Sequence, residues 1–406
     1  MRIVYLHQYF VTPQMAGAGR SYEMARRLVA AGHDVHMVTS DQGGAPADAI
    51  WRETLEAGIH VHWTSVRYDN VMGYQARIRA FLIFAWRAAR KAAALRGDVI
   101  FATSTPLTIA IPAVFASWRS RAPMVFEVRD LWPAVPIAIG VIKSPVAKWG
   151  AIQLERFAYR HATRIVALAP GMRNEIVATG YPIERIAVIP NGCDLDAFSD
   201  TIPAQRLRQS HSWLGSRPLL VFTGTFGLVN GMAYLVRLAD AVYRIDPEVR
   251  IAAVGSGREY DQTRQLAVDL DVLGRNFFLL GKQPKKVAVA WTVAADMTIA
   301  LFTGPEIVWR DAVQNKFFDS LAAGKPVASN FSGWQSKLAV DAGAGLILSA
   351  SSVESAAREV VRALRDRRWL EVAGRTAREL AVNCFDRNAL AADLARVLGD
   401  ACGQAP

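Results

Sequence analysis

Short apolar runs of four or five residues alternate with helical stretches along the first half of the chain. The pattern predicts strands over 3–6, 35–39, 60–63, 99–102, 124–128, 165–169 and 186–189. It also predicts a helix over 21–31, which Gly32 ends. Buried runs of this length between helices are typical of parallel strands covered on both faces. The first half therefore predicts an α/β domain with a doubly wound sheet.

A second series of the same kind follows a stretch of turn residues from 191 to 218, which we interpret as a linker. Its strands are predicted over 219–223, 250–254, 277–280, 297–301, 326–329 and 345–348, and the tail predicts two helices between about 352 and 399. We expect domains over 1–195 and 196–375, and a C-terminal helix in 376–406 that packs back toward the first domain. Two such domains would face each other across a cleft at the carboxyl ends of their strands.

Composition excludes several classes of protein. With 52% hydrophobic and 20% charged residues among 406, the chain is not disordered. Its three cysteines (Cys193, Cys384 and Cys402) lack CxxC spacing, which argues against a disulfide scaffold and a cysteine metal site. We expect no transmembrane helix, because no run of about 18 apolar residues exists. The first residues predict a strand and not a signal peptide.

The positive charge is concentrated in the first half. The net charge is +11; residues 1–190 hold 22 basic and 13 acidic residues, and the remainder holds 25 and 23. This imbalance suggests an anionic partner, which could be nucleic acid, a phosphorylated substrate or an acidic membrane surface. A solvated basic face is the plain alternative.

Two short segments of the first half carry candidate chemistry. Gly17 and Gly19 precede the first helix, where glycines let the backbone approach a phosphate, although an ordinary glycine turn would look the same. Glu127, Arg129 and Asp130 follow a buried strand, so their charges are expected at the cleft. Arg129 could clamp a phosphate or carboxylate, or form an internal ion pair with either acidic neighbour.

The histidines give a weaker signal. His7 ends the first predicted strand and is the one histidine that we place near the cleft, where a packed structural role is the alternative. His60 and His62 lie on one face of a predicted strand without an evident third ligand, so we do not expect a metal site.

The segment 310–326 is the most specific signal in the chain. Asp311 and Asp319 are eight residues apart, and Asn315 and Lys316 stand where a helix should begin. Lys316 and the free N–H groups of that helix terminus could hold a diphosphate, and Asp319, one turn later, could accept hydrogen bonds from ribose hydroxyls. A plain amphipathic helix capped by Gly324 is the alternative.

Taken together, the whole chain resembles the GT-B glycosyltransferases of the GT4 type. The matching pieces are the glycine loop 17–19, Ile-Pro-Asn-Gly at 189–192, Val-Gly-Ser-Gly at 254–257, and the block that ends in Ala-Ala-Gly-Lys-Pro at 326. More narrowly, 128–133 and 315–319 resemble the subgroup that includes the L-fucosamine transferases of O-antigen and capsule synthesis.

The resemblance implies a fold of two Rossmann-like domains and a retaining transfer. The donor would be a nucleotide diphosphate sugar, UDP-linked and carrying an N-acetylated deoxy-amino sugar, bound by the second domain. The acceptor would be a polyprenyl-diphosphate-linked saccharide of lipopolysaccharide synthesis, bound by the first domain. We expect no metal or other cofactor, and a cytoplasmic protein that attaches to the inner face of the plasma membrane.

The motifs and the resemblance together assign roles to individual residues. The expected catalytic residues are Arg129, Asp130 and Asp311; the expected donor-binding residues are Gly17, Gly19, Asn191, Gly224, Gly257, Lys282, Asn315, Lys316 and Asp319; and the expected acceptor-binding residues are His7, Arg20 and Glu127. Three departures from the family pattern matter. Aspartates replace its usual pair of glutamates, Arg129 stands where its histidine is usual, and 224–231 lacks its Arg and Lys. The diphosphate would then depend on Lys316, with Lys282 or Arg258.

A basic helix over 77–91 predicts attachment to an anionic membrane. A helical wheel places Tyr74, Ile78, Phe81, Leu82, Ala85, Trp86 and Ala89 on one face, and Arg77, Arg79, Arg87, Arg90 and Lys91 on the other. Ile83 and Phe84 fall among the arginines, where a bilayer surface would accommodate them. A solvated basic face whose two apolar residues pack on a neighbouring loop is the alternative.

Two other functions stay open at this point. A GT-B nucleotide-sugar epimerase would need acid and base carboxylates in the cleft and no membrane-facing helix. A nucleic-acid-binding protein is suggested by the pI of about 9.8. Against it, the charge lies with an apolar helix and no RRM-like stacking motif occurs, so we expect no nucleic acid partner.

Overall fold

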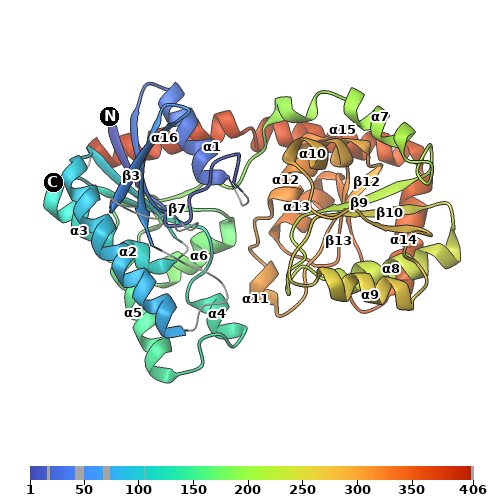
Figure 1. Ribbon diagram of the computed structural model, residues 1–406, viewed down its shortest axis with the longest axis horizontal. Coiled ribbons are helices and arrows are strands. Elements are labelled where there is room, and N and C mark those ends of the chain that lie inside the picture. The colour runs from blue at the N-terminus through green and yellow to red at the C-terminus, as the bar shows by residue number, and fades with distance from the viewer. Residues whose placement is uncertain (16–18, 42–49, 67–73, 105, 404–406) are drawn as a thin grey trace. The chain divides into compact units, whose positions relative to one another are not determined.

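The computed structural model describes residues 1–15, 19–41, 50–66, 74–104 and 106–403. The chain forms two compact units (Figure 1). Unit 1 comprises Met1–Pro190 together with Arg387–Pro406, and unit 2 comprises Asn191–Asp386. The chain therefore leaves unit 1, builds unit 2, and returns to unit 1 with its last helix.

Unit 1 is built on one sheet with the strand order β3-β4-β2-β1-β5-β6-β7-β8, in which only the β3–β4 pair is antiparallel. The strands are β1 (Arg2–Leu6), β2 (Asp34–Asp41), β3 (Trp51–Glu56), β4 (Ile59–Ser65), β5 (Val99–Thr103), β6 (Met124–Val128), β7 (Arg164–Ala167) and β8 (Ile186–Val188). The helices are α1 (Arg20–Ala30), α2 (Tyr74–Leu95), α3 (Ala110–Ser120), α4 (Ala134–Ala138), α5 (Pro145–His161), α6 (Pro170–Ala178) and α16 (Arg387–Gly403).

The two faces of this sheet are covered by different helices. Helices α2, α3 and α5 lie side by side over one face, while α1 and α16 pack together on the other (Figure 1). The core under α1 and α16 joins strand residues such as Ile3 and Phe101 to Leu394 and Leu398 of α16. The last helix is therefore an integral part of unit 1.

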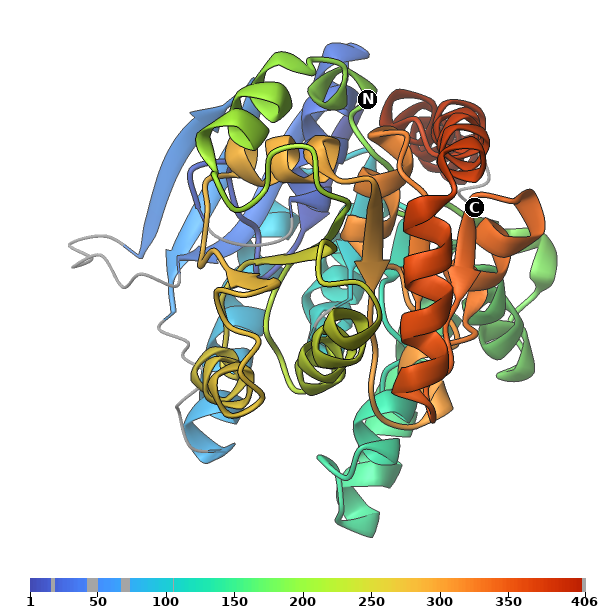
Figure 2. The same cartoon turned by 90° about the vertical axis from the view of Figure 1, so that its right-hand side faces the viewer.

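Unit 2 is built on an all-parallel sheet with the order β11-β10-β9-β12-β13-β14. The strands are β9 (Leu219–Thr223), β10 (Arg250–Val254), β11 (Phe277–Leu279), β12 (Met297–Ala300), β13 (Val327–Ser329) and β14 (Gly345–Ile347). The helices are α7 (Ile202–Ser210), α8 (Met232–Ile245), α9 (Tyr260–Asp269), α10 (Lys285–Ala294), α11 (Glu306–Trp309), α12 (Asn315–Ala322), α13 (Trp334–Ala342), α14 (Val353–Arg365) and α15 (Arg367–Cys384). Figure 2 shows α14 beside α8 on one face of the unit.

The predicted strands are confirmed, each within a few residues, and so is the doubly wound α/β class. Strand β3 was not predicted, because an exposed antiparallel edge strand has no buried apolar run to reveal it. The predicted linker over 191–218 is wrong. Helix α7 lies there, and it buries only Ala204 and Leu207, which is too few for a visible period.

The tail also differs from the prediction, with three helices in place of two. Asp366 separates α14 from α15, and its carboxylate caps α15 by accepting a hydrogen bond from the Trp369 amide at 2.8 Å. Asp386 precedes the last helix. Because α14 to α16 are all rich in Ala, Arg and Leu, composition alone did not reveal these short breaks.

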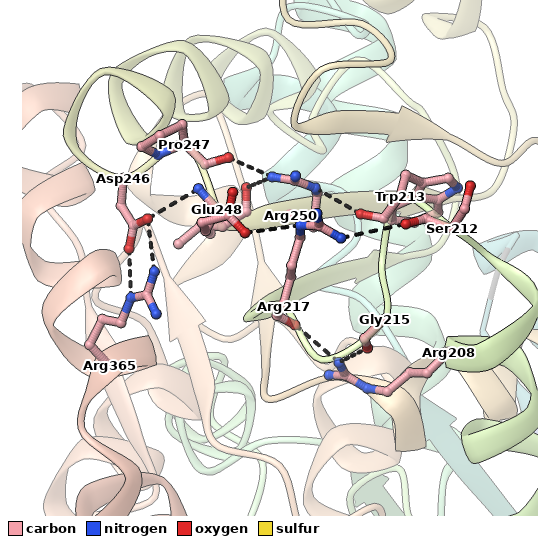
Figure 3. Close-up of polar contacts among 11 residues, drawn as sticks. Arg208, Ser212, Trp213, Gly215, Arg217, Asp246, Pro247, Glu248, Arg250 and Arg365 are labelled. Atoms are coloured by element: carbon pink, nitrogen blue, oxygen red, sulfur yellow. Dashed lines mark hydrogen bonds and ion pairs between the residues drawn. The ribbon is translucent and has the colours of Figure 1, made fainter.

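Arginines fix the amino-end loops of the unit 2 sheet (Figure 3). Arg250 donates to the carbonyl oxygens of Trp213 at 2.9 Å and Pro247 at 2.6 Å. The Arg365 guanidinium forms two hydrogen bonds with the Asp246 carboxylate, at 2.7 and 2.9 Å. These arginines therefore stabilise the fold at the amino ends of the strands, whereas ligands of such sheets bind at the carboxyl ends.

Candidate functional site

Three adjacent strands of unit 1 end in polar residues. His7 follows β1, Ser104 follows β5, and Arg129 follows β6. The Ser104 hydroxyl accepts a hydrogen bond from the Arg129 amide at 2.9 Å, and Nη1 of Arg129 lies 3.5 Å from Nε2 of His7. The structure thus brings together two residues that the sequence placed at the candidate site, and Ser104 supports one of them.

His7 is held as a neutral ring. Burial, and then the positive charge of Arg129, lower its pKa well below the usual value. Because a guanidinium can only donate, Nε2 acts as the acceptor and the proton is assigned to Nδ1. Within the described residues, Nδ1 has no hydrogen-bond partner. The ring therefore has a buried N–H group, without a partner among these residues, at the carboxyl end of β1.

Arg20 and Glu127 form an internal ion pair. Nη2 of Arg20 lies 2.9 Å from Oε1 of Glu127, and both side chains are buried. Burial alone would raise the pKa of Glu127, but the guanidinium of Arg20, and then that of Arg129, outweigh it and hold the pKa below its usual value. Arg20 also donates to the carbonyl of Pro190 at 2.6 Å. Because these internal contacts already occupy both side chains, they argue against direct contact of Arg20 or Glu127 with an acceptor.

The alternative role of Arg129 was an ion pair with Glu127 or Asp130, but the partner of Glu127 is Arg20. Glu127 pairs with Arg20 and with the Thr103 hydroxyl, which donates to it at 2.6 Å. The Arg129 side chain is half-buried beside His7, and Asp130 is exposed. Arg129 therefore lies at the carboxyl end of β6, and its contact with a substrate stays a prediction.

Gln8 is a residue that the sequence analysis missed. Its side chain is buried next to His7, and within the described residues neither its amide nitrogen nor its amide oxygen has a hydrogen-bond partner. Buried amides without partners are rare, because each costs the loss of its hydrogen bonds to water. The sequence signal that could have revealed Gln8 is the pair of polar residues, His7 and Gln8, that directly follows the first apolar run.

In unit 2, glycine loops pack against each other at the carboxyl ends of β9 and β10. A Cβ on Gly255 would lie 1.8 Å from the Gly224 oxygen, and one on Gly257 would lie 2.5 Å from the Phe226 oxygen. Both residues have positive φ angles, 151° and 158°. Gly257 is therefore required by loop packing, whatever its role toward a donor.

Lys316, in the first turn of α12, lies beside these loops. Its Nζ is 3.8 Å from the centre of the Phe222 ring, and a Cβ on Gly224 would approach that nitrogen to 3.0 Å. The residue is half-buried as a whole, but its nitrogen is fully buried and has no hydrogen-bond partner in the described part of the chain. Burial lowers the pKa of Lys316 to about 7. An unpaired amine that is shielded from water beside a helix N-terminus is suited to bind an anionic ligand.

The segment before α12 is held by several contacts. Asp311 is 6% exposed and pairs with Arg310, whose Nε lies 2.8 Å from the carboxylate. The amide of Asn191 donates to the Val313 carbonyl at 3.0 Å. Asn191 and Asp311 thus shape the approach to α12, in which Asn315 and Asp319 are half-buried.

Lys282 and the predicted glycines of unit 1 are placed as follows. Lys282 is exposed after β11, next to Gly281, whose carbonyl accepts from the Gly255 amide at 2.8 Å. It therefore neighbours the glycine loops. Gly19 precedes α1 and has open space where a Cβ would stand, so its backbone does not require glycine. Gly17 lies outside the described residues.

Histidines of β2 and β4 contact one another. Nδ1 of His36 is 3.0 Å from Nε2 of His62, and the rings of His36 and His60 stack at 4.9 Å. Over the residues that the structure describes, no three histidine, cysteine or acidic side chains converge on a position for a metal ion. In the same residues, no helix is long and apolar enough to span a bilayer.

Helix α2 corrects the predicted membrane face. Phe84, expected among the arginines at the surface, is 1% exposed and packs inward, whereas Leu82 and Trp86 are exposed. Arg87 donates to the Ser65 carbonyl at 2.8 Å, and Lys91 pairs with Glu53 at 2.6 Å. The helix carries apolar residues around most of its circumference, so the wheel did not identify the buried stripe.

In a comparison with known protein families, each unit matches a glycosyltransferase model. Residues 17–192 match the model of the Glycosyl transferase 4-like domain, and residues 217–366 match that of Glycosyl transferases group 1. A GDP-mannose-dependent alpha-(1-6)-phosphatidylinositol monomannoside mannosyltransferase of Mycobacterium tuberculosis is 22% identical over 302 residues, 74% of this chain and 75% of that protein.

Solved structures agree on the fold. HepE of Anabaena in complex with UDP superposes with a TM-score of 0.73 at 17% identity, over 98% of this chain and 100% of that one. WaaG, a glycosyltransferase involved in lipopolysaccharide biosynthesis, gives a TM-score of 0.68 at 16% identity, over 98% and 99%. With both family models matched and the GT-B architecture present, the chain belongs to the GT4 family of GT-B glycosyltransferases.

Proposed function

We propose that this glycosyltransferase moves an N-acetylated deoxy-amino sugar, with retention, from a UDP-linked donor to a lipid-linked saccharide. Unit 2 binds the donor and unit 1 the acceptor, at the inner face of the plasma membrane, during synthesis of a bacterial surface polysaccharide. The observation that carries the proposal is the buried, unpartnered amine of Lys316 beside the glycine loops.

In this proposal, positively charged groups that are shielded from water bind the diphosphate of the donor. The Lys316 amine and the first amides of α12 hold the diphosphate, Asp319 accepts from the ribose, and Lys282 adds charge from the neighbouring strand end. A charge-assisted hydrogen bond of this kind contributes about 1.5–3 kcal/mol. The UDP found with HepE supports the choice of nucleotide.

Catalysis rests on stabilising the leaving diphosphate and on positioning the acceptor hydroxyl. Arg129, with the N–H group of His7, contacts the transferred sugar or the acceptor. Asp130, the next residue after Arg129, contributes a carboxylate to the same site. Asp311 acts as a positioning residue, because its carboxylate holds the Arg310 guanidinium. No metal or cofactor is needed for this scheme, since cationic side chains offset the diphosphate charge.

The lipid-linked acceptor is supported by the relatives and by charge. The mycobacterial relative acts, by its name, on a phosphatidylinositol monomannoside, which is a membrane lipid. WaaG is described as an enzyme of lipopolysaccharide biosynthesis. The excess of basic residues in the first half of the chain would favour an anionic membrane surface.

The test couples donor binding to transfer. Calorimetry with UDP and GDP should show tighter binding of UDP, and radiolabelled UDP-sugars should label lipid extracted from bacterial membranes. Arg129→Lys keeps the charge but loses the planar guanidinium. We expect its turnover to fall about a hundredfold or more, while UDP affinity is retained.

Three results would contradict the proposal. Binding of neither nucleotide would remove the donor assignment. Epimerised nucleotide sugar formed without acceptor would favour the epimerase alternative. If Arg129→Lys mainly lowered the melting temperature, Arg129 would be structural.

A further inference from the structure

Helices α2 and α3 enclose a groove at the amino end of the unit 1 sheet. The groove measures about 670 Å³ and is lined by residues of the last turns of both helices and of the loop after α2. Its charged lining consists of Arg90, Arg96 and Arg119, and Phe115 forms part of its wall. This α2–α3 groove lies at the amino ends of the strands, whereas His7 and Arg129 lie at their carboxyl ends.

The three groove arginines are not used inside the fold. Within the described residues, none of them forms a hydrogen bond or an ion pair, in contrast to Arg250 and Arg365 of unit 2 (Figure 3). Neither α2 nor α3 contains an Asp or Glu, and Asp98, the one acid between 70 and 126, accepts a hydrogen bond from the Arg2 amide at 2.7 Å. The groove is therefore strongly cationic and lacks an internal counter-charge.

Exposed aromatic side chains surround this charge. Trp86 is 62% exposed, Trp118 is 74% exposed and Phe115 is 41% exposed. The Arg90 guanidinium lies 5.0 Å from the Trp86 ring centre, and the rings of Phe115 and Trp118 are 6.3 Å apart. Leu82 and Ile111 extend the apolar strip along the same two helices. Large apolar groups gain little from exposure to water, so the strip points to a partner that covers it.

The chemistry of the groove selects among anionic partners. Nucleic acid would use the aromatic rings for stacking, but it gains nothing from exposed Leu82 and Ile111. An anionic bilayer offers phosphate to the arginines, an interfacial layer to the tryptophans, and acyl chains to the aliphatic side chains. Among these partners, the bilayer surface is the one that matches all three kinds of side chain.

We propose that the α2–α3 groove binds the phosphate headgroup of an anionic phospholipid, while Trp86, Phe115 and Trp118 enter the bilayer interface around it. This contact extends the proposed function, because it would hold the enzyme at the membrane that carries its acceptor. The headgroup contact itself does not require the transfer reaction.

Vesicle sedimentation tests the groove. Wild-type protein should pellet with vesicles that contain phosphatidylglycerol, much less with phosphatidylcholine alone, and less as salt rises. The double variant Arg90→Gln with Arg119→Gln should bind phosphatidylglycerol vesicles about tenfold more weakly or worse. Arg206→Gln with Arg264→Gln, at two exposed positions of unit 2, removes the same charge and should bind within about twofold of wild type.

A second variant separates insertion from charge. Trp86→Ser with Trp118→Ser leaves the net charge unchanged and should also weaken binding to phosphatidylglycerol vesicles. Melting temperatures should match wild type for every variant, because all the replaced side chains are exposed. Calorimetry with UDP should be unaffected by the groove variants, so loss of UDP binding alone would count against the donor proposal and not against the groove.

Several outcomes would overturn the groove assignment. Equal binding by the groove variant and the unit 2 control would show a nonspecific charge effect. Absence of wild-type pelleting would remove the membrane contact. Release by inorganic phosphate at constant ionic strength would identify a free-phosphate site. Retention of an oligonucleotide through the groove arginines, without vesicle binding, would identify a nucleic acid site.

Discussion

At the scale of residues, Lys316 is the most unusual group of unit 2. Its amine is buried against Phe222 without a hydrogen-bond partner, and burial lowers its pKa from 10.5 to about 7. In the unfolded chain the amine binds a proton up to about pH 10, whereas in the folded protein it loses it near 7. Stability contributed by this group therefore rises with pH between these two values.

Replacement of this amine should raise stability and weaken donor binding. We expect Lys316→Met to stabilise the apo protein by about 1–3 kcal/mol, because an unpaired polar group becomes apolar. UDP affinity at pH 7 should fall about tenfold or more. In wild type, UDP binding should take up a proton and weaken from pH 7 to pH 9, and the variant should lose that dependence. Calorimetry in buffers of different ionisation enthalpy measures both effects.

Lys337→Met supplies the matched control, since Lys337 is an exposed lysine of α13 in the same unit. It should leave UDP affinity and its pH dependence unchanged. Wild-type affinity in Lys316→Met would show that Lys316 does not contact the diphosphate.

Sequence reasoning at this scale found the charges but not their partners. Lys316 was found because a lysine at a predicted helix start is a local signal. The pairing of Glu127 with Arg20 was not, because the two residues are 107 positions apart and Arg129 is much closer in sequence. Which arginine pairs with a buried carboxylate depends on how α1 packs on the sheet, and short-range patterns do not encode that.

At the scale of elements, strands β2, β3 and β4 share a polar edge. His62 of β4 contacts Glu53 of β3 at 2.9 Å and His36 of β2 at 3.0 Å. Burial, and then the charge of Lys91, lower the pKa of His62 from 6.5 to about 4, despite the Glu53 carboxylate. Its ring is therefore neutral in the folded state over the range in which the unfolded chain protonates it.

This edge should lose stability in mild acid. Between pH 6.5 and about 4 the unfolded state binds the His62 proton and the folded state does not, so stability falls as the pH is lowered. The loss should amount to about 1–3 kcal/mol for this group. Urea unfolding of unit 1 at pH 7, 6 and 5 should show it, and His62→Gln should make the dependence on pH shallower, while the buried His7 keeps contributing to it.

His161→Gln is the comparison, because His161 is exposed on α5. That variant should keep the wild-type slope. Identical slopes for His62→Gln and wild type would contradict the prediction.

Buried strands were predicted well, and surface elements were not. Strands such as β1 and β9 are apolar on both faces, so their residues alone mark them. Strand β3 and helix α7 bury few side chains and carry no such mark. For α2 the helix itself was predicted, but its buried face depends on contacts with α3 and the sheet.

At the scale of the whole molecule, the two units have separate cores. Leu394 of α16 is fully buried in unit 1, among residues of β1 and β5. Leu364 of α14 is buried in unit 2, in a cluster that includes residues of α8 and β9. A defect in one core should therefore be felt mainly in its own unit.

Leu394→Ala should destabilise unit 1 by about 2–5 kcal/mol, through lost burial and the cavity that remains. Hydrogen exchange followed by mass spectrometry should show faster exchange in 1–190 and 387–403, with 191–386 unchanged. Leu364→Ala should give the reverse pattern. Equal acceleration in both units by either variant would mean that the units do not unfold separately.

The return of the chain to unit 1 also has a consequence for its synthesis. Domains generally fold as units while the chain leaves the ribosome. Unit 2 is contained in one continuous stretch, so it can fold as soon as residue 386 has emerged. Unit 1, although most of it is made first, lacks Leu390, Leu394 and Leu398 until the whole of unit 2 has been made. During that interval the apolar face of its sheet has no α16 to cover it, so the half made first is the half that a chaperone would have to protect longest.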